Sequence, residues 1–443
     1  MLDQAFAKKN KNENFEVNIN KLDDSQRAAV QSQGSNIVIR ASAGSGKTST
    51  LITAVANYRY ENINDRICAI TYTRAARAEM EERLHAMGIF DVEVTTIHVW
   101  ARNLLNDFAV KYDFKVRILE EGDIKAILED IADEYRMRRG GRTKINIGVL
   151  YSYITGNKNM DVTDAYKRVL ALLEEQYIKY KRDNVLYDFT DYPLYLWDIM
   201  EYYNEYIYNI DALFVDEFQD VDEVQFDTFK RVLSKKKFFI GDGWQSIFVF
   251  RGADGEVFEK LEDFELYKLK YNYRSYQEII NYAANVYEQF KPRVQDGEEC
   301  YITDVTFAGN CSIVCNRGYG GTISIIDSFG SGNHIKNKVN YYMNSKECKD
   351  AFDRFMSTNP MILCRTNKQV KAVQEFGHTN VSTIHQAKGL EYDNVLVIDT
   401  AIKSIEDLNV AYVALTRARD NLMVMCWSMF EQMWQGKNNL WFI

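Results

Sequence analysis

The sequence predicts an α/β protein with two domains, each built around a parallel β-sheet. Short runs that are apolar throughout recur along the chain, and helical patterns separate them. Such runs are typical of strands buried on both faces of a parallel sheet. They form two groups, which indicates one sheet on each side of Tyr276. The predicted strands are 37–39, 67–70, 212–215 and 238–240 in the first group, and 361–364, 395–398 and 422–425 in the second.

Two segments that differ in residue composition interrupt these domains. Residues 109–184 are charged and helical in pattern, and residues 296–357 are rich in Gly, Asn and Thr, with a β-like run at 322–326. We interpret the first as a helical accessory insertion and the second as a small accessory insertion. The remaining predicted boundaries are a polar lead-in at 1–20, a first domain at 21–108 and 185–275, and a second domain at 276–295 and 358–443.

The composition is that of a globular protein. Of 443 residues, 46% are hydrophobic and 26% are charged, which excludes a mostly disordered chain. The net charge of −9 means that a nucleic-acid partner would have to be held by a local groove. The N-terminus lacks the apolar core of a signal peptide, and no uncharged apolar stretch is long enough to span a membrane. The seven cysteines are scattered without zinc-site spacing, so we expect reduced thiols and a cytoplasmic location.

Residues 41–48 read ASAGSGKT and predict a phosphate-binding loop. They directly follow the first predicted strand and precede a helical pattern. Small residues let backbone N–H groups turn toward phosphate oxygens at the start of a helix. Lys47 would then reach the β- and γ-phosphates, and the Thr48 hydroxyl would bind Mg²⁺. Ala41 stands where the usual pattern has its first Gly, and the alternative is a plain Gly/Ser turn between a strand and a helix.

Residues 215–220 read VDEFQD and end the third predicted strand. Asp216 suits a contact to Mg²⁺, and Glu217 is placed to polarise an attacking water. The carboxyl edge of a parallel sheet is where such sheets bind ligands. An Asp-Glu pair alone is more often a solvated turn, but together with the phosphate loop it predicts the acidic box of an NTPase.

These two boxes belong to an ordered series that resembles the motifs of UvrD/Rep/PcrA-type superfamily 1A DNA helicases. About ten motifs occur in the family's order, and the resemblance runs from about residue 22 to residue 425. The matching stretches are LDDSQ at 22–26, TRAARAEM at 73–80, TIH at 96–98, DFTD at 188–191, VDEFQD, GDGWQSIFVFRGA at 241–253, NYRS at 272–275, RTN at 365–367, TIHQAKGLEYD at 383–393 and AYVALTRARD at 411–420.

The resemblance implies two RecA-like domains that share one ATP and its Mg²⁺. Gln26 would read adenine, Tyr273 would stack on it, and Glu391 would contact the ribose. Gln245 would sense the γ-phosphate or its water. Arg274, and Arg417 from the other domain as an arginine finger, would neutralise the transferring phosphoryl group. The nucleotide contacts are completed by the loop residues Ala43, Gly44, Ser45, Gly46, Lys47, Thr48 and Ser49.

The resemblance also implies a path for single-stranded DNA. Phe248 and Phe250 match the family's base-stacking aromatics, although their spacing also fits a strand with both rings in the core. Trp100 would either stack on DNA or lie in the core. The basic run at 135–144 is either a DNA contact or a solvated loop. The other candidate DNA contacts are Thr73, Thr96, His98, Arg138, Arg139, Arg251, Arg365, Thr383 and His385.

Two departures from the family pattern stand out. Only 90 residues separate Ser275 from Arg365, which predicts that the second accessory domain is reduced to a small module within 296–357. Leu408-Asn409-Val410 stands where the family commonly has Arg-Arg-Leu, which predicts the loss of a backbone or interdomain contact.

We expect an ATP-dependent 3′→5′ helicase and single-stranded DNA translocase. Its partners would be single-stranded DNA, single/double-strand junctions and a protein such as a nuclease or a repair factor. The alternative is a DNA-stimulated ATPase subunit that regulates a partner nuclease and unwinds little itself. The opposite-polarity superfamily 1B helicases fit less well, because they lack the QSIFVFRGA continuation.

Overall fold

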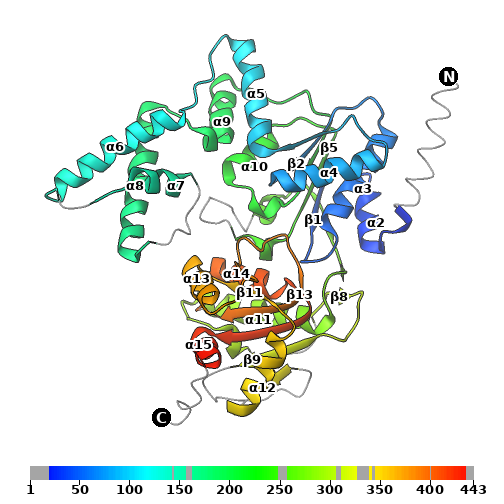
Figure 1. Cartoon of the computed structure of the whole chain (residues 1–443). Helices are drawn as coiled ribbons and strands as arrows, with labels where there is room; N and C mark the ends of the chain where they lie inside the picture. Colours follow the sequence, from blue (N-terminus) through cyan, green and yellow to red (C-terminus); the bar gives the residue numbers. More distant parts are fainter. Residues whose placement is uncertain are drawn as a thin grey trace. The chain divides into compact units, whose positions relative to one another are not determined.

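The computed structural model describes residues 19–141, 144–155, 162–247, 257–305, 311–326, 339–341, 345–399 and 401–435. These residues form two compact units (Figure 1). One unit combines the described residues up to Val94 with Ile210–Glu223 and those from Ser234 onward. The other combines Thr95–Asn209 with Val224–Leu233. The predicted boundaries of the first RecA-like domain and of its helical insertion remain a proposal.

The first sheet of the larger unit has the strand order β3-β2-β4-β5-β1-β6. Parallel pairing joins β1 to β5 and β6, and β4 to β2 and β5, with Ile37 opposite Phe238. All four strands predicted here are present. The edge strand β6 was not predicted, because its largely exposed sequence ELYK lacks the apolar signature. The strands are β1 (Asn36–Arg40), β2 (Ile67–Thr71), β3 (Glu93–Thr96), β4 (Ala212–Val215), β5 (Lys236–Gly241) and β6 (Glu265–Lys268).

Local sequence signals set the helices that accompany this sheet. Asp23 and Gln26 form a capping box at the start of α2 (Asp24–Val30), and Thr73 caps α4 (Arg74–Ala86). Helix α3 (Lys47–Glu61) begins directly after the glycine loop. Apolar side chains of these helices and of the strands form one core. Short 3₁₀ turns follow β4 at η2 (Phe218–Asp220) and β5 at η3 (Gly243–Gln245), and a third, η5 (Val257–Lys260), precedes β6.

The second sheet has the strand order β10-β9-β14-β13-β11-β12, and its strand pairs are parallel. Helices α11 (Gln277–Gln295) and α14 (Ile405–Leu415) pack on one face. Helices α12 (Ser345–Met356), α13 (Asn367–Glu375) and α15 (Trp427–Gln435) pack on the other. The strands are β9 (Thr322–Ile326), β10 (Val339–Tyr341), β11 (Met361–Cys364), β12 (Val381–Thr383), β13 (Tyr392–Asp399) and β14 (Ala418–Cys426). A separate two-stranded ribbon pairs β7 (Tyr271–Asn272) with β8 (Val314–Cys315). The turn η6 (Ile302–Asp304) follows α11.

The expected accessory insertion at 296–357 needs correction. Strand β9 pairs with β14 inside the second sheet, and Ile323 and Ile325 are fully buried in its core. Cys348 and Phe352 of α12 pack against the opposite face. Residues 322–326 and 345–356 are therefore integral to the second sheet domain. The run TISII was predicted to be β-like, but its polar residues Thr322 and Ser324 and its polar surroundings did not indicate a strand of the central sheet.

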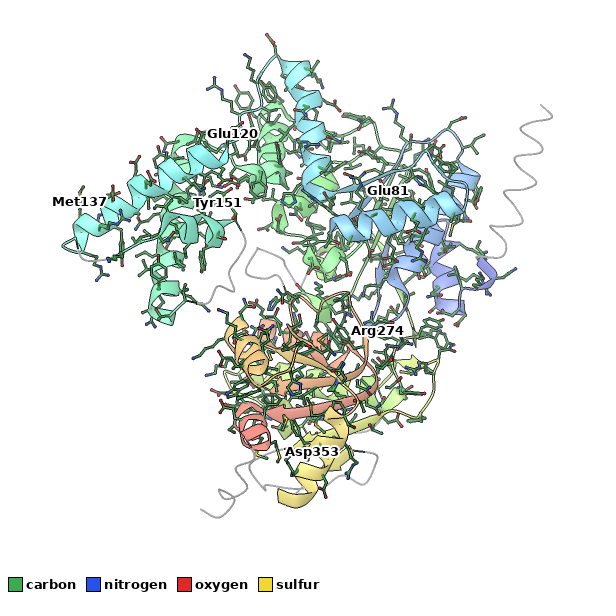
Figure 2. All side chains as sticks on the ribbon, viewed as in Figure 1. Glu81, Glu120, Met137, Tyr151, Arg274 and Asp353 are labelled. Carbon is green, nitrogen blue, oxygen red and sulfur yellow. The ribbon has the colours of Figure 1, made fainter. Side chains whose placement is uncertain are left out.

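The smaller unit is helical. Helices α6 (Glu121–Arg138), α7 (Ile147–Ile154) and α8 (Asp164–Asn184) share a core, and Figure 2 shows Met137 at the end of α6 far from Glu120. Trp100 is buried and lies 5.6 Å from the Phe229 ring, so the core interpretation of this residue is correct. The remaining helices are α5 (Ile97–Tyr112), η1 (Phe189–Asp191), α9 (Tyr192–Tyr203) and α10 (Glu223–Lys230), whose first residue clusters with the larger unit.

All seven cysteines are free thiols, and five of them are buried. Over the described ranges, we find no helix with both the length and the apolar character needed to cross a bilayer.

Candidate nucleotide-binding site

The loop between β1 and α3 has the backbone geometry of a phosphate cradle. Gly44 and Gly46 have φ values of +70° and +78°, which glycine adopts without strain. They turn the chain so that α3 begins at Lys47. The first N–H groups of a helix have no partner within the helix, so this end of α3 attracts anions. The Ser45 hydroxyl donates to the Ser42 carbonyl at 2.8 Å and closes the loop.

The NYRS segment after β7 holds this loop in place. The Tyr273 N–H donates to the Gly44 carbonyl at 2.8 Å, and the Asn272 amide donates to the Ala43 carbonyl at 2.5 Å. A Cβ atom on Gly44 would lie 2.6 Å from the Arg274 Cβ. Glycine is therefore required here by contact as well as by its φ angle.

Gln26 and Tyr273, the predicted adenine contacts, lie on one side of the loop. The Gln26 side-chain amide donates to the Ser45 carbonyl at 3.0 Å, and its oxygen accepts from the Asp23 N–H. The Tyr273 hydroxyl donates to Asp23 at 2.6 Å, while the side chain remains 39% exposed. The same short segment therefore fixes both residues beside the loop.

The acidic box lies opposite the start of α3. The Thr48 hydroxyl is 3.4 Å from an Asp216 carboxylate oxygen. Burial and the neighbouring Glu217 charge raise the pKa of Asp216. Burial would also raise the pKa of Glu217, but the Lys47 and Lys388 charges outweigh it and lower that pKa. Glu217 has a left-handed backbone with φ +48°, which is uncommon for a residue other than glycine.

Gln219 is a site residue that sequence reasoning did not single out. It is fully buried, donates to the Glu217 carboxylate at 2.6 Å and accepts from the Asp242 N–H at 2.8 Å. Gln245 in turn donates to the Asp242 carboxylate at 2.8 Å. Gln219 therefore links the ends of β4 and β5, where Glu217 and Gln245 stand. Its place inside VDEFQD was the available signal.

Lys388 is a second residue that was missed. Its ammonium group donates to the Asp220 carboxylate at 2.6 Å and to the Gln245 carbonyl at 2.9 Å. Lys388 follows β12 of the second sheet, whereas Asp220 and Gln245 follow strands of the first. This lysine therefore ties the two sheets together at the acidic box. Its position inside TIHQAKGLEYD was the only sequence signal.

Arg274 points toward the second sheet (Figure 2). Its Nε donates to Glu391 at 2.6 Å, and Arg419 lies 3.7 Å from the same carboxylate. Glu391, the predicted ribose contact, is thus held by two arginines in this structure.

Arg417 is buried and satisfied by acceptors of its own domain. It donates to the carbonyls of Val413 at 2.9 Å and Leu390 at 3.1 Å, and to the Thr416 hydroxyl at 3.3 Å. Burial and the nearby positive charge of Arg274 lower its pKa to about 9. A buried guanidinium gains strongly from an anion beside it, which fits a role at a phosphate.

At Leu408-Asn409-Val410, where the loss of a backbone or interdomain contact is expected, Asn409 bonds to a residue of the first sheet domain. The Asn409 amide donates to the Ser246 carbonyl at 2.7 Å, and the Tyr287 hydroxyl donates to Asn409 at 2.9 Å. Beside it, Trp244 stacks face to face on Tyr287 at 4.3 Å and meets the edge of Tyr412 at 5.2 Å.

The donors at the loop suit ATP with Mg²⁺. The Thr48 hydroxyl and Asp216 carboxylate are oxygen ligands, as Mg²⁺ prefers. Within the described residues, no cluster of three or more His, Cys, Asp or Glu could hold a metal alone. The Ser49 hydroxyl accepts from Arg83 at 2.6 Å, so this predicted nucleotide contact faces α4.

Several predicted DNA contacts lie at element ends. Thr73 is exposed at the start of α4, and Thr96 and His98 stand where β3 meets α5. Thr383 ends β12 and is buried, and His385 follows it and is half-buried. Thr73, Thr383 and His385 belong to the larger unit, and Thr96 and His98 belong to the smaller one.

The other predicted DNA contacts are charged or aromatic. Arg365 forms an ion pair with Asp407 at 2.6 Å, and Arg138 and Arg139 are exposed at the end of α6. Phe248, Phe250 and Arg251 lie outside the described residues.

Two parallel sheets, with a phosphate loop and an acidic box on the first, Arg417 beside the second and Arg274 after the ribbon strand β7, define a RecA-like P-loop protein. Residues 22–265 match the UvrD/REP helicase N-terminal domain, and residues 335–429 match the UvrD-like helicase C-terminal domain. The chain therefore belongs to the UvrD/REP helicase family.

Similar proteins carry helicase names. A "Probable DNA helicase" of Mycoplasma pneumoniae is 25% identical over 91% of this chain and 83% of its own length. A "DNA helicase II" of Rickettsia typhi is 29% identical over 64% of this chain and 47% of its own length. The "ATP-dependent DNA helicase PcrA" of Staphylococcus aureus is 27% identical over 63% of this chain, which spans 41% of that protein.

Proposed function

We propose that this protein is an ATP-dependent DNA helicase that moves 3′→5′ along single-stranded DNA. The observation that carries the proposal is the pairing of a phosphate loop on the first sheet with two arginines, Arg274 and Arg417, beside the second. Family membership and the PcrA similarity support the activity and its ATP dependence.

The residues of the loop bind and orient the nucleotide. The N–H groups at the start of α3 and the Lys47 ammonium group face the phosphates. Thr48 and Asp216 would hold Mg²⁺, which supplies charge neutralisation at the phosphates. Glu217, whose pKa stays low, is the base that polarises the attacking water, and Gln245 positions that water.

Arg274 and Arg417 complete the site when the two sheets close on the nucleotide. Arg417 must exchange the Val413 and Leu390 carbonyls for phosphate oxygens. Hydrolysis therefore depends on domain closure, because the phosphate loop belongs to the first sheet domain and Arg417 to the second. Differential affinity of the closed and open states for DNA would turn this cycle into movement. Phe248 and Phe250 would grip successive bases.

Strand displacement on tailed duplexes tests the proposal. The purified chain is given duplexes with a 3′ or a 5′ single-stranded tail, with and without ATP, and DNA-stimulated phosphate release is measured in parallel. ATP-dependent displacement of the 3′-tailed duplex alone is expected. Displacement from the 5′ tail would overturn the direction. DNA-stimulated hydrolysis with no displacement would favour a regulatory ATPase subunit, and hydrolysis unaffected by DNA would overturn the whole proposal.

A further inference from the structure

A short segment outside every motif packs against the NYRS loop. Strand β8 pairs with β7, so that Cys315 lies opposite Asn272. The Asn316 N–H then donates to the Asn272 carbonyl at 2.8 Å. Further along, the Gln277 N–H donates to the Gly318 carbonyl at 2.9 Å. Backbone bonds therefore fix the segment on both sides of Arg317.

The Arg317 side chain joins two loops that carry the site's arginines. Its Nη1 donates to the Arg274 carbonyl at 3.0 Å and to the Arg419 carbonyl at 3.1 Å. Its Nη2 donates to the Asp420 carboxylate at 2.6 Å. The guanidinium also lies over the Tyr276 ring, 4.0 Å from its centre. A planar fork with several donors can make these contacts together, which a lysine cannot.

Two further bonds show that the loops already approach each other here. The Ser275 hydroxyl donates to the Ala418 carbonyl at 2.5 Å, and the Tyr276 N–H donates to the Arg419 carbonyl at 3.1 Å. Arg317 lies where these two loops meet, and it adds a hydrogen bond to the backbone carbonyl of Arg274. Arg417 directly precedes Ala418, whose carbonyl takes part in this contact.

We propose that Arg317 is a positioning residue that sets Arg274 and Arg417 relative to each other for phosphoryl transfer. The proposal rests on the ATPase function proposed above. Arg317 touches neither nucleotide nor DNA in this scheme and acts through the two loop backbones.

This placement predicts an effect on turnover rather than on nucleotide binding. Tyr273 has its own anchors at the Gly44 carbonyl and at Asp23. Gln26 is bonded to Ser45 within the first sheet domain. Loss of the Arg317 side chain leaves these contacts in place, whereas it removes its bonds to the Arg274 and Arg419 carbonyls and to the Asp420 carboxylate.

The test compares Arg317→Met with the matched control Arg293→Met in the full chain. Arg293 also pairs with a carboxylate, Glu298 at 2.8 Å, and lies over an aromatic ring, Phe290 at 5.4 Å, but it touches neither loop. With saturating single-stranded DNA, Arg317→Met should lower kcat for ATP by roughly 10- to 100-fold, since small misplacements of catalytic groups cost this much. Its KM for ATP should stay close to that of the unmodified chain, and Arg293→Met should match the unmodified chain in both.

A double-variant cycle separates positioning from general structure. In an Arg417→Ala background, adding Arg317→Met should lower the residual rate by a smaller factor than it does in the unmodified chain, because one of the two arginines whose relative position it sets is gone. Arg317→Lys keeps the positive charge, and its kcat should lie between those of Arg317→Met and the unmodified chain. If Arg317→Met does not fold, the comparison is made with Arg317→Lys.

A normal kcat in Arg317→Met or Arg317→Lys, or full additivity with Arg417→Ala, would overturn the inference while leaving the proposed function intact. An unmodified chain without DNA-stimulated hydrolysis would instead overturn the proposed function.

Discussion

Asn409 and Ser246 are joined by a hydrogen bond of 2.7 Å from the side-chain amide to the backbone carbonyl. Asn409 lies on α14 of the second sheet domain, and Ser246 directly follows Gln245 of the first. Both residues are buried. The bond therefore connects the residue after Gln245, the proposed γ-phosphate sensor, to the helix that ends shortly before Arg417.

Replacing Asn409 by Leu should uncouple hydrolysis from unwinding. The substitution leaves the buried Ser246 carbonyl and the Tyr287 hydroxyl without this partner, which costs about 1–3 kcal/mol at each unsatisfied group. We expect several-fold more ATP to be consumed per base pair unwound. The matched control is Asn421→Leu, which removes an amide bond of the same length to Asn394 within the second sheet domain. Equal coupling ratios in the two variants would contradict the role of Asn409.

Replacing Lys47 by Ala should remove DNA-stimulated ATP hydrolysis and leave single-strand binding largely intact. Lys47 is the first residue of α3, and its charge acts on Asp216, Glu217 and Asp242 across the site. Phosphate release and fluorescence anisotropy of a labelled oligonucleotide measure the two properties. Lys349→Ala, at a half-buried lysine of α12 that pairs with Asp353, is the control. Near-normal turnover in Lys47→Ala would refute the loop assignment.

Gly46→Ala should weaken nucleotide binding, whereas Gly88→Ala should not. Both glycines have nearly the same φ, +78° and +77°, so both substitutions carry a left-handed strain of about 1–2 kcal/mol. A Cβ atom on Gly46 would also lie 2.8 Å from the Gln26 amide nitrogen, whereas one on Gly88 would meet nothing within 4 Å. We expect similar losses of stability in urea but a roughly tenfold weaker binding of a fluorescent ATP analogue for Gly46→Ala alone, about 1.4 kcal/mol. Equal affinities would show that the cradle tolerates a side chain.

The Asp220–Lys388 pair predicts a pH dependence of stability. Burial raises the pKa of Asp220 to about 6, although Lys388 and Lys47 oppose this and Glu217 adds to it. Between pH 4 and pH 6 the folded chain therefore holds a proton that the unfolded chain has lost, so the contribution of Asp220 to the free energy of unfolding falls as pH rises. Asp220→Asn lacks this titration. Relative to the unmodified chain, its free energy of unfolding in urea should rise by about 2 kcal/mol from pH 4.5 to pH 7.5.

Asp353→Asn is the control for this titration, because Asp353 is exposed on α12 (Figure 2). The free energy of unfolding of Asp353→Asn, relative to that of the unmodified chain, should change little between pH 4.5 and pH 7.5. If the relative free energy of unfolding of Asp220→Asn were also independent of pH, the raised pKa of Asp220 would be contradicted.

Most of the fold could be predicted because buried parallel strands leave a local signal. Runs such as Phe214-Val215 and Val395-Leu396 are apolar on both faces, and each became a central strand. Strand β6 could not be found this way, since it is an exposed edge. Strand β9 was seen but misplaced, because its pairing with β14 joins residues about a hundred positions apart. Local patterns do not reveal such pairings.

The candidate site could be predicted only where a motif carried it. The loop at Gly44–Thr48 and the acidic box were recognised from local sequence, and the structure places Thr48 beside Asp216. The links made by Gln219, Lys388 and Arg317 depend on side chains that meet across the fold. Their residue types are ordinary, and only the three-dimensional arrangement gives them a role.

The stacking of Trp244 on Tyr287 and against Tyr412 has a practical consequence. An indole is an intrinsic fluorophore whose emission responds to neighbouring rings and to water. Trp244 follows a strand of the first sheet, and both tyrosines lie on helices of the second. Separation of the two domains would expose this indole to solvent, so emission from a chain that keeps Trp244 as its sole tryptophan would report each opening without an added dye.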